Sequence, residues 1–345
     1  MRPATVFIAL LMAELITGCR IVPKYGEHSL RGGDEILVCG EPFHSGTRVV
    51  NWMEPGGYDA YRVERKFVPA DRADWKTTKT ENSQLETPNR YGFRQSSQLS
   101  SNDLERVRTQ GWDLDSLRKV IDLFVLHYDV SGTSRRCFET LHDRRGLSVH
   151  FLLDVDGTIY QTLDLKERAW HATTANTRAI GIEIAQIGAV PMAQRKKLDL
   201  WYTQLEGATR LTIPEFVSPT GVRTPNFVGR PARPNPIVGH IHGETLVQYD
   251  FTPEQYAALT KLTASLCRVF PKLRCDYPRD ESGKLVLGKL SENQLTQYTG
   301  LLGHFHIQKE KHDPGPAFQW DKVVTDAQRD LRRRRWRRLR WKQRS

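Results

Sequence analysis

IDLFVLH, at residues 121–127, is a short apolar run that ends in a histidine. Short runs rich in branched and aromatic side chains are typical of buried strands. A second run, IGIEI at residues 180–184, predicts another strand, in which Glu183 lies on the opposite face from Ile182 and Ile184 because side chains alternate along a strand. The two runs therefore predict a buried sheet that holds His127 at the end of one strand and Glu183 inside another.

The segments around these strands alternate between strand and helix patterns. Residues 149–153 and 158–163 read as a hairpin around the turn Asp156-Gly157. Thr252-Pro253-Glu254-Gln255 predicts a helix start, with Thr as the N-cap, Pro at the first helical position and Gln completing a capping box. The amphipathic helix that follows is expected to end at Pro271. This order of elements predicts an α/β fold with a mixed central β-sheet flanked by α-helices.

Two further helices are predicted from weaker patterns. Phe138 lies in a helix-spaced segment that opens with Ser131 and Ser134 as candidate caps. Residues 192–205 form the second predicted helix, inside a Pro- and Gly-rich insertion at about residues 190–250. We expect this insertion to flank the functional site.

The first residues have the pattern of a secretory signal. Arg2 precedes an apolar stretch, and residues 15–19 read Leu-Ile-Thr-Gly-Cys, which resembles a bacterial lipobox. Residues 1–18 are therefore expected to be a lipoprotein signal peptide and Cys19 the lipidated residue; an ordinary signal peptide or a short buried helix is the alternative. The apolar run is too short to span a membrane. We expect secretion across the inner membrane and a membrane-anchored lipoprotein that faces the periplasm.

Residues 19–112 read as an irregular N-terminal extension. They are rich in Gly, Pro, Asn, Ser and charge, with short apolar runs at residues 35–38 and 49–50. An oxidising compartment would allow disulfides among the four cysteines beyond the signal, in any of three connectivities, although four buried thiols are an equal alternative. Those cysteines are Cys39, Cys137, Cys267 and Cys275.

The positive charge of the chain is concentrated at its C-terminus. The formal net charge is +11, and residues 329–345 hold nine Arg and one Lys against one Asp, so this end contributes 10 − 1 = +9 and the rest 11 − 9 = +2. The basic tail at residues 326–345, with Trp336 and Trp341 among the arginines, is expected to bind an anionic surface. A solvated charged helix end is the alternative, and no nucleic-acid partner is expected.

A polar segment rich in histidine, GHFHIQKEKHDPGPAFQW, occupies residues 303–320. The motifs LHYD, SVHFLLDVDGTIYQ, RAWHA, IGIEI and GH followed by KHDPGPAF occur in this order. Together they resemble the type-2 N-acetylmuramoyl-L-alanine amidases, which share a fold with the peptidoglycan recognition proteins. The resemblance spans about residues 123–320 apart from the insertion, and implies a zinc amidase domain at residues 113–325.

The resemblance implies that His127, His304 and Asp313 hold one zinc ion. Two neutral imidazoles and a carboxylate leave a fourth position open for water, which is the arrangement that catalytic zinc requires. Such a site lowers the pKa of bound water towards about 7. Asp313 precedes Pro-Gly-Pro, which fixes the backbone after the predicted ligand.

The resemblance also implies roles for residues around the metal. Glu183 would be the general base and Lys311 would stabilise the oxyanion. Trp170 and His171 would line the substrate groove, where a ring can stack on a sugar and an imidazole can bind glycan or peptide; a packing role for Trp170 is an equal alternative. His150 is a further candidate for substrate binding, with a hydrogen-bonded core residue as the alternative.

Two pairs of histidines leave the assignment open. His306 lies two residues after His304, so on an extended strand both would face the same side. We prefer His304 because it directly follows Gly303, as in the family motif. His240 and His242, in the insertion, have a spacing that can bind metal, but we expect His240 to form a wall of the substrate pocket.

The predicted function is hydrolysis of the amide bond between N-acetylmuramic acid and L-alanine of peptidoglycan. The expected partners are peptidoglycan or muropeptide substrate, a lipid anchor to the membrane and one Zn²⁺ ion. A non-catalytic peptidoglycan-binding protein on the same fold is the main alternative. The full set of three metal ligands with Glu183 and Lys311 argues against that alternative.

Overall fold

A computed structural model describes residues 23–62 and 91–342 of the chain. The predicted signal peptide and Cys19 lie outside these residues. The helices are α2 (Ser101–Gln110), α3 (Leu114–Val120), α4 (Ser134–Phe138), α5 (Pro253–Val269), α6 (Glu292–Gln297) and α7 (Trp320–Lys342). None of the helices in the described part is both long and apolar enough to cross a membrane.

The centre of the molecule is a six-stranded mixed sheet in the order β13-β4-β7-β5-β6-β3. Only the β5–β6 pair is antiparallel within this sheet. Its strands are β3 (Val49–Asn51), β4 (Leu123–Tyr128), β5 (Phe151–Leu153), β6 (Ile159–Gln161), β7 (Ala179–Ile184) and β13 (Gly300–Gly303). The predicted mixed sheet and its hairpin are confirmed.

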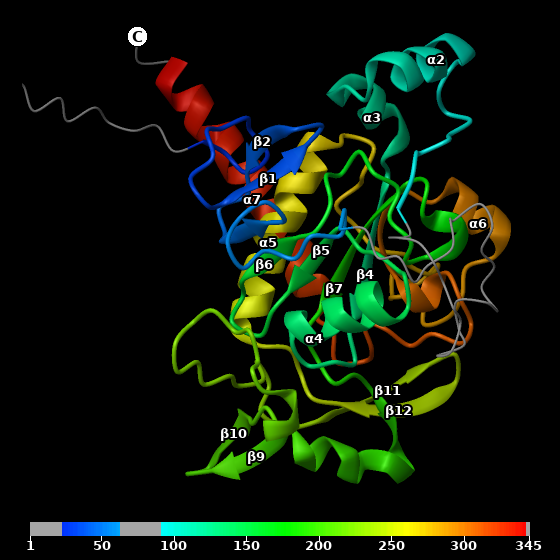
Figure 1. Cartoon of the computed structure of the whole chain (residues 1–345). Helices are drawn as coiled ribbons and strands as arrows, with labels where there is room; N and C mark the ends of the chain where they lie inside the picture. The colour runs from blue at the N-terminus through cyan, green and yellow to red at the C-terminus, as the bar shows by residue number, and fades with distance from the viewer. Residues whose placement is uncertain (1–22, 63–90, 343–345) are drawn as a thin grey trace, which may run out of the picture.

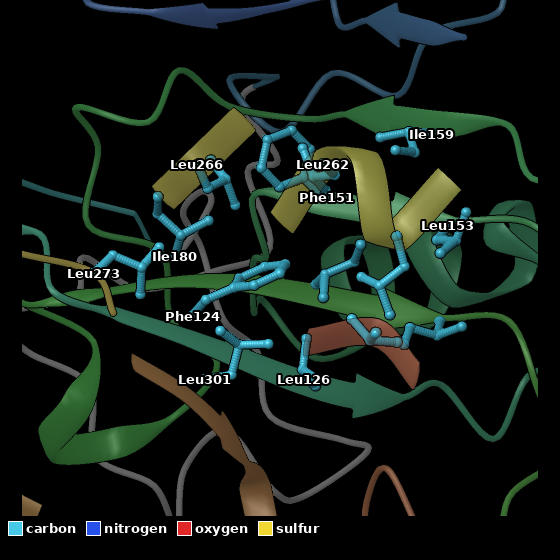
Figure 2. Close-up of a cluster of buried hydrophobic side chains, with 14 of the residues drawn as sticks. Phe124, Leu126, Phe151, Leu153, Ile159, Ile180, Leu262, Leu266, Leu273 and Leu301 are labelled. Carbon is cyan, nitrogen blue, oxygen red and sulfur yellow. The ribbon is translucent and has the colours of Figure 1, made fainter. Parts of the chain in front are cut away.

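One face of the sheet packs on the long helices. Even-numbered residues of β4 and β7, such as Phe124 and Ile180, meet Leu262 and Leu266 of α5 (Figure 2). Helix α7 lies beside α5, as Figure 1 shows in red and yellow. Because this face is covered by apolar residues, the odd-numbered residues of β4 and β7 point to the other face, which carries the site.

Helix α5 begins as its sequence predicts. Thr252 accepts from the backbone N–H of Gln255, and the Gln255 side chain accepts from the N–H of Thr252, which forms a capping box. The helix ends at Val269, just before Pro271. The shorter helix α4 is capped by Thr133, however, and not by Ser131 or Ser134, because the Thr133 side chain faces the N–H of Arg136.

The N-terminal extension is more ordered than its composition predicts. It contains the hairpin β1 (Glu35–Val38) and β2 (Glu41–His44), strand β3 and helix α2. The two apolar runs are buried, since Ile36 and Val38 join the core beside α5 and β3 pairs with β6 at the sheet edge. These tertiary contacts stabilise strands that are too short to be evident from local sequence.

The insertion forms its own lobe at the lower end of the molecule in Figure 1. It holds β8 (Val190–Pro191), β9 (Tyr202–Leu205), β10 (Ala208–Leu211), β11 (Ile237–Ile241) and β12 (Glu244–Gln248). The predicted helix at residues 192–205 is wrong: residues 192–200 form a 3-10 helix and β9 follows. Trp201 and Tyr202 are buried in the lobe's own cluster with Val247 and Tyr249, and their burial requires the chain to turn there.

The four cysteines of the described residues are free thiols. Cys137 is buried, and Cys39, Cys267 and Cys275 are partly buried. Burial raises the pKa of the Cys39 thiol to about 12, so this thiol is unreactive at neutral pH. Of the two alternatives that the sequence leaves open, the structure shows four thiols.

Candidate active site

Strand register brings the two central polar residues together. His127 of β4 lies directly opposite Glu183 of β7 in the parallel ladder. Both side chains lie on the sheet face that α5 does not cover, because they alternate with Leu126 and Ile182 of the core. The carboxyl ends of β4 and β7 therefore present an imidazole and a carboxylic acid side by side.

The neighbouring strand β13 supplies the second imidazole. Gly303, its last residue, lies opposite Leu126, so His304 follows at the level of His127. The Nδ1 atoms of His127 and His304 are 3.0 Å apart, and Oδ2 of Asp313 lies 2.8 Å from the first and 3.1 Å from the second. These three buried side chains thus direct one donor atom each at a common point.

His306 is turned away from this point. Residues 304–306 form a 3-10 turn and not an extended strand, so His304 and His306 do not share a face. Nδ1 of His306 accepts from the N–H of Gly303 at 2.9 Å, and its Nε2 donates to the carbonyl of Val286 at 2.9 Å. Both ring nitrogens of His306 are therefore used in the core, whereas Nδ1 of His304 faces His127 and Asp313.

The far nitrogens of the two converging imidazoles are also held. Nε2 of His127 lies 3.0 Å from Nδ1 of His171, and Nε2 of His304 lies 2.6 Å from Oε1 of Gln308. Such outer contacts fix the orientation of imidazoles that bind metal through the other nitrogen. Gln308 was not predicted from the sequence, although its position one helical turn after His304 is a usable signal.

A cavity of about 740 Å³ opens over these residues. It is lined by polar and apolar side chains from β4, α4, β7 and the loop before Asp313. Its residues include His127, Val130, Leu141, Arg145, Trp170, His171, Glu183, His304, Gln308, Lys311, His312 and Asp313. The cavity is of the size that holds a small ligand, with the converging imidazoles and carboxylates along its wall.

The surroundings of Glu183 favour the protonated form of its carboxyl group. Burial raises the pKa of Glu183 well above its ordinary 4.5, and the carboxylates of Asp313 and Asp129 raise this pKa further. The positive charge of Lys311 acts in the opposite direction. Oε2 of Glu183 is shielded from solvent and has no hydrogen-bond partner among the described residues. An acid in this state is poised to exchange a proton with a group in the cavity.

The donor set suits a divalent metal ion. Burial, with the positive field of His304, lowers the pKa of His127 to about 4, which keeps its imidazole neutral. Burial alone would raise the pKa of Asp313, but the adjacent His304 and His127 lower it well below its ordinary value, so Asp313 is a carboxylate. A neutral imidazole and a carboxylate are the forms in which histidine and aspartate bind zinc.

The residues predicted to bind substrate divide into two groups. Trp170 and His171 line the cavity, and Trp170 stacks with Arg168, whose guanidinium carbon lies 4.8 Å from the ring centre. His150 does not reach the cavity, which corrects its predicted role. It is fully buried, and accepts from the N–H of Gly181 at 3.1 Å while its Nε2 lies 2.8 Å from Arg94.

His240 is also misplaced by the prediction. It lies exposed on β11, where its Nδ1 is 3.2 Å from the hydroxyl of Thr245. It does not line the cavity, because it belongs to the solvent-facing side of the β11–β12 hairpin. The sequence spacing of His240 and His242 could not show which of them points inward.

Comparison with protein families identifies the chain. Residues 117–316 match the model of the N-acetylmuramoyl-L-alanine amidase family. The chain belongs to this amidase family. The match contains all of the converging residues described above and confirms the resemblance that the motifs indicate. As a member of the amidase family, the protein is an enzyme that hydrolyses amide bonds of peptidoglycan.

Several solved amidases are similar to this chain at low identity. A selenomethionine derivative of AmpD is 16% identical with a TM-score of 0.30, over 61% of this chain and 86% of AmpD. AmiD from E. coli, in complex with the substrate anhydro-N-acetylmuramic acid-L-Ala-D-gamma-Glu-L-Lys, is 18% identical with a TM-score of 0.33, over 60% and 57% of the two chains. The endolysin LysCS from Clostridium intestinale is 15% identical with a TM-score of 0.32, over 61% and 86%. No curated protein sequence matched the chain.

Proposed function

We propose that this amidase cleaves the bond between N-acetylmuramic acid and L-alanine at a single zinc site formed by His127, His304 and Asp313. The observation that carries the proposal is the approach of two Nδ1 atoms and one carboxylate oxygen to within 3.1 Å of one another. When bound, zinc supplies a Lewis acid that lowers the pKa of water and polarises a carbonyl. The remaining chemistry falls to side chains of the chain itself.

Glu183 is suited to be the general base. It lies beside His127 across the β4–β7 ladder and lines the same cavity. The raised pKa of its carboxyl moves its proton affinity towards that needed to take a proton from water and deliver it to the leaving amine near neutral pH. Glu183 therefore both accepts and returns the proton in the proposed reaction.

Lys311 is suited to stabilise developing negative charge. It lines the cavity two residues before Asp313, and its charge is close enough to lower the pKa of Glu183. A fixed positive charge in a partly closed site stabilises a carbonyl oxygen as it becomes anionic. Trp170, on the same wall, offers an aromatic surface for the sugar or peptide.

A digest of defined muropeptides tests this proposal. Purified protein is expected to release stem peptide with a free L-alanine amine, as read by mass spectrometry. A chelator should stop the release, and one equivalent of zinc should restore it. Stoichiometric zinc without any peptide release would favour the alternative, a non-catalytic peptidoglycan-binding protein.

We further propose the lipid anchor at Cys19 and periplasmic location, on the sequence pattern of residues 1–19 alone. The basic tail is proposed to bind anionic surfaces. Helix α7 carries the chain into this tail, and its first turns are anchored because Val323 and Ala327 are buried. Truncation after Arg332 spares this packing, and should reduce co-sedimentation with anionic lipid vesicles; unchanged co-sedimentation would remove the proposed role.

A further inference from the structure

Three potential metal ligands gather where the insertion meets the active-site loop. His242 lies in the turn of the β11–β12 hairpin, and Glu244 is the first residue of β12. His312 directly precedes Asp313 in the active-site loop. None of the three takes part in the proposed hydrolysis. Their side chains nevertheless combine two imidazoles and a carboxylate, which is the donor set that zinc prefers.

His242 is held in an uncommon backbone conformation. Its φ is +55°, and with Gly243 it forms the two-residue turn between Ile241 and Glu244. Residues other than glycine are uncommon at such a φ, and Asn, Asp and His are the ones that adopt it most readily. The N–H of His242 donates to the carbonyl of Leu287 at 2.9 Å, which fixes the turn against the following part of the chain.

His312 faces this turn from the other side. Its ring centre is 6.2 Å from that of His242, and its Nε2 lies 3.3 Å from Oε2 of Glu244. Nε2 of His242 and Nε2 of His312 are both shielded from solvent, and neither has a hydrogen bond of good geometry within the described residues. Shielded ring nitrogens that lack a well-aligned hydrogen bond are costly unless another group binds them.

We propose that His242, Glu244 and His312 bind a second divalent metal ion of the zinc or nickel class. Two imidazoles on one zinc, each at about 2 Å, have ring centres about 5 Å apart. The observed separation of 6.2 Å therefore requires the two rings to approach by about 1 Å, and the three donor atoms, which are farther apart than those of His127, His304 and Asp313, must converge when the ion binds. Imidazole and carboxylate together favour zinc, nickel or copper over magnesium.

The position of the site determines how the second metal ion enters and which parts of the chain it connects. The Glu244 side chain is 60% exposed, so an ion can enter from solvent without passing through the catalytic cavity. Once bound, the ion would join the hairpin of the insertion to the loop that carries Lys311 and Asp313. The second ion therefore acts as a clamp between the insertion and the active-site loop.

Zinc binding to the full-length protein tests the clamp. Metal-free protein is titrated with zinc in equilibrium dialysis, and bound zinc is measured by elemental analysis. We expect the protein to bind two equivalents of zinc, the second with lower affinity than the first. His242→Asn retains a residue that tolerates positive φ, and Glu244→Gln retains shape. Each should weaken the second equivalent by at least about tenfold, since even an outer-shell change costs about 10–100-fold in metal affinity.

Matched variants separate this site from others. His240→Asn changes the exposed neighbour in the same hairpin and should keep both equivalents. His127→Ala should lose the tighter equivalent and keep the weaker one. Binding of a single equivalent by the unmodified protein would overturn the proposal. A second equivalent that survives His242→Asn with unchanged affinity would also overturn it, and would point to the cluster of Asp34, Glu35 and His44.

Discussion

Replacement of Glu183 by glutamine should separate catalysis from stability. The substitution keeps the shape of the side chain but removes its proton exchange. General acid–base catalysis contributes about 10²–10⁴-fold, which corresponds to about 3–5 kcal/mol of transition-state stabilisation. We therefore expect kcat for muropeptide hydrolysis to fall by at least about 100-fold, while zinc content stays at its original value because Glu183 is not one of the converging ligands.

The same substitution should stabilise the metal-free fold. The folded protein raises the pKa of Glu183 above its ordinary 4.5. The contribution of Glu183 to the free energy of unfolding is therefore fully present below pH 4.5 and is lost as the pH rises through the pKa of Glu183 in the folded protein. A shielded polar atom without a hydrogen bond costs about 1–3 kcal/mol, and an ionised oxygen such as Oε2 of Glu183 would cost more. Glu183→Gln avoids this loss, and its melting temperature should exceed that of the unmodified protein by a few degrees at pH 8.

Thermal unfolding of the chelated protein between pH 4 and pH 8 measures this gain. The difference between Glu183→Gln and the unmodified protein should vanish near pH 4 and grow towards pH 8. A difference that is constant with pH would show that glutamine acts through packing and not through ionisation.

In the activity assay, retention of more than a tenth of the muropeptide hydrolysis by Glu183→Gln would refute the assignment of Glu183 as the base.

Four other substitutions test the remaining geometry. His304→Ala should lose zinc on dialysis, whereas His306→Ala should keep zinc but lose about 1–3 kcal/mol of stability with its two buried backbone contacts; the reverse metal contents would contradict the assignment. Lys311→Met should lower kcat about 10²–10³-fold with little change in KM, and a change in KM alone would contradict its role. Gly181→Ala would place a methyl carbon 2.5 Å from the His171 ring, so we expect displacement of that ring and about 10–100-fold weaker zinc binding; unchanged affinity would show that His171 does not orient His127.

The central elements of this fold could be predicted because their signals are local. The apolar runs of β4 and β7 and the capping box at Thr252 specify structure within a few residues. Strand β3 could not be predicted, because three residues become a strand only through pairing with β6. The 3-10 helix after Pro191 also depends on burial of Trp201, which is a tertiary contact.

The site shows the same division between local and long-range information. His304 and Asp313 are recognisable as candidates because they lie in one motif, and strand alternation places Glu183 on the polar face. The contact of His171 with His127 joins residues 44 positions apart, and no periodic pattern indicates it. Arg94 is a stronger example: an arginine in an irregular segment reads as a surface residue, yet it is fully buried against His150.

The insertion leaves and re-enters the domain through neighbouring strands, since Val190 of β8 pairs with Val247 of β12. An excursion whose two ends are hydrogen-bonded to each other can lengthen or shorten without moving the strands that carry the catalytic side chains. Glu183 lies before this excursion and Asp313 after it, so the distance between them is insulated from changes in the lobe. The lobe is therefore a natural position for grafting recognition elements onto an amidase whose chemistry is to remain unaltered.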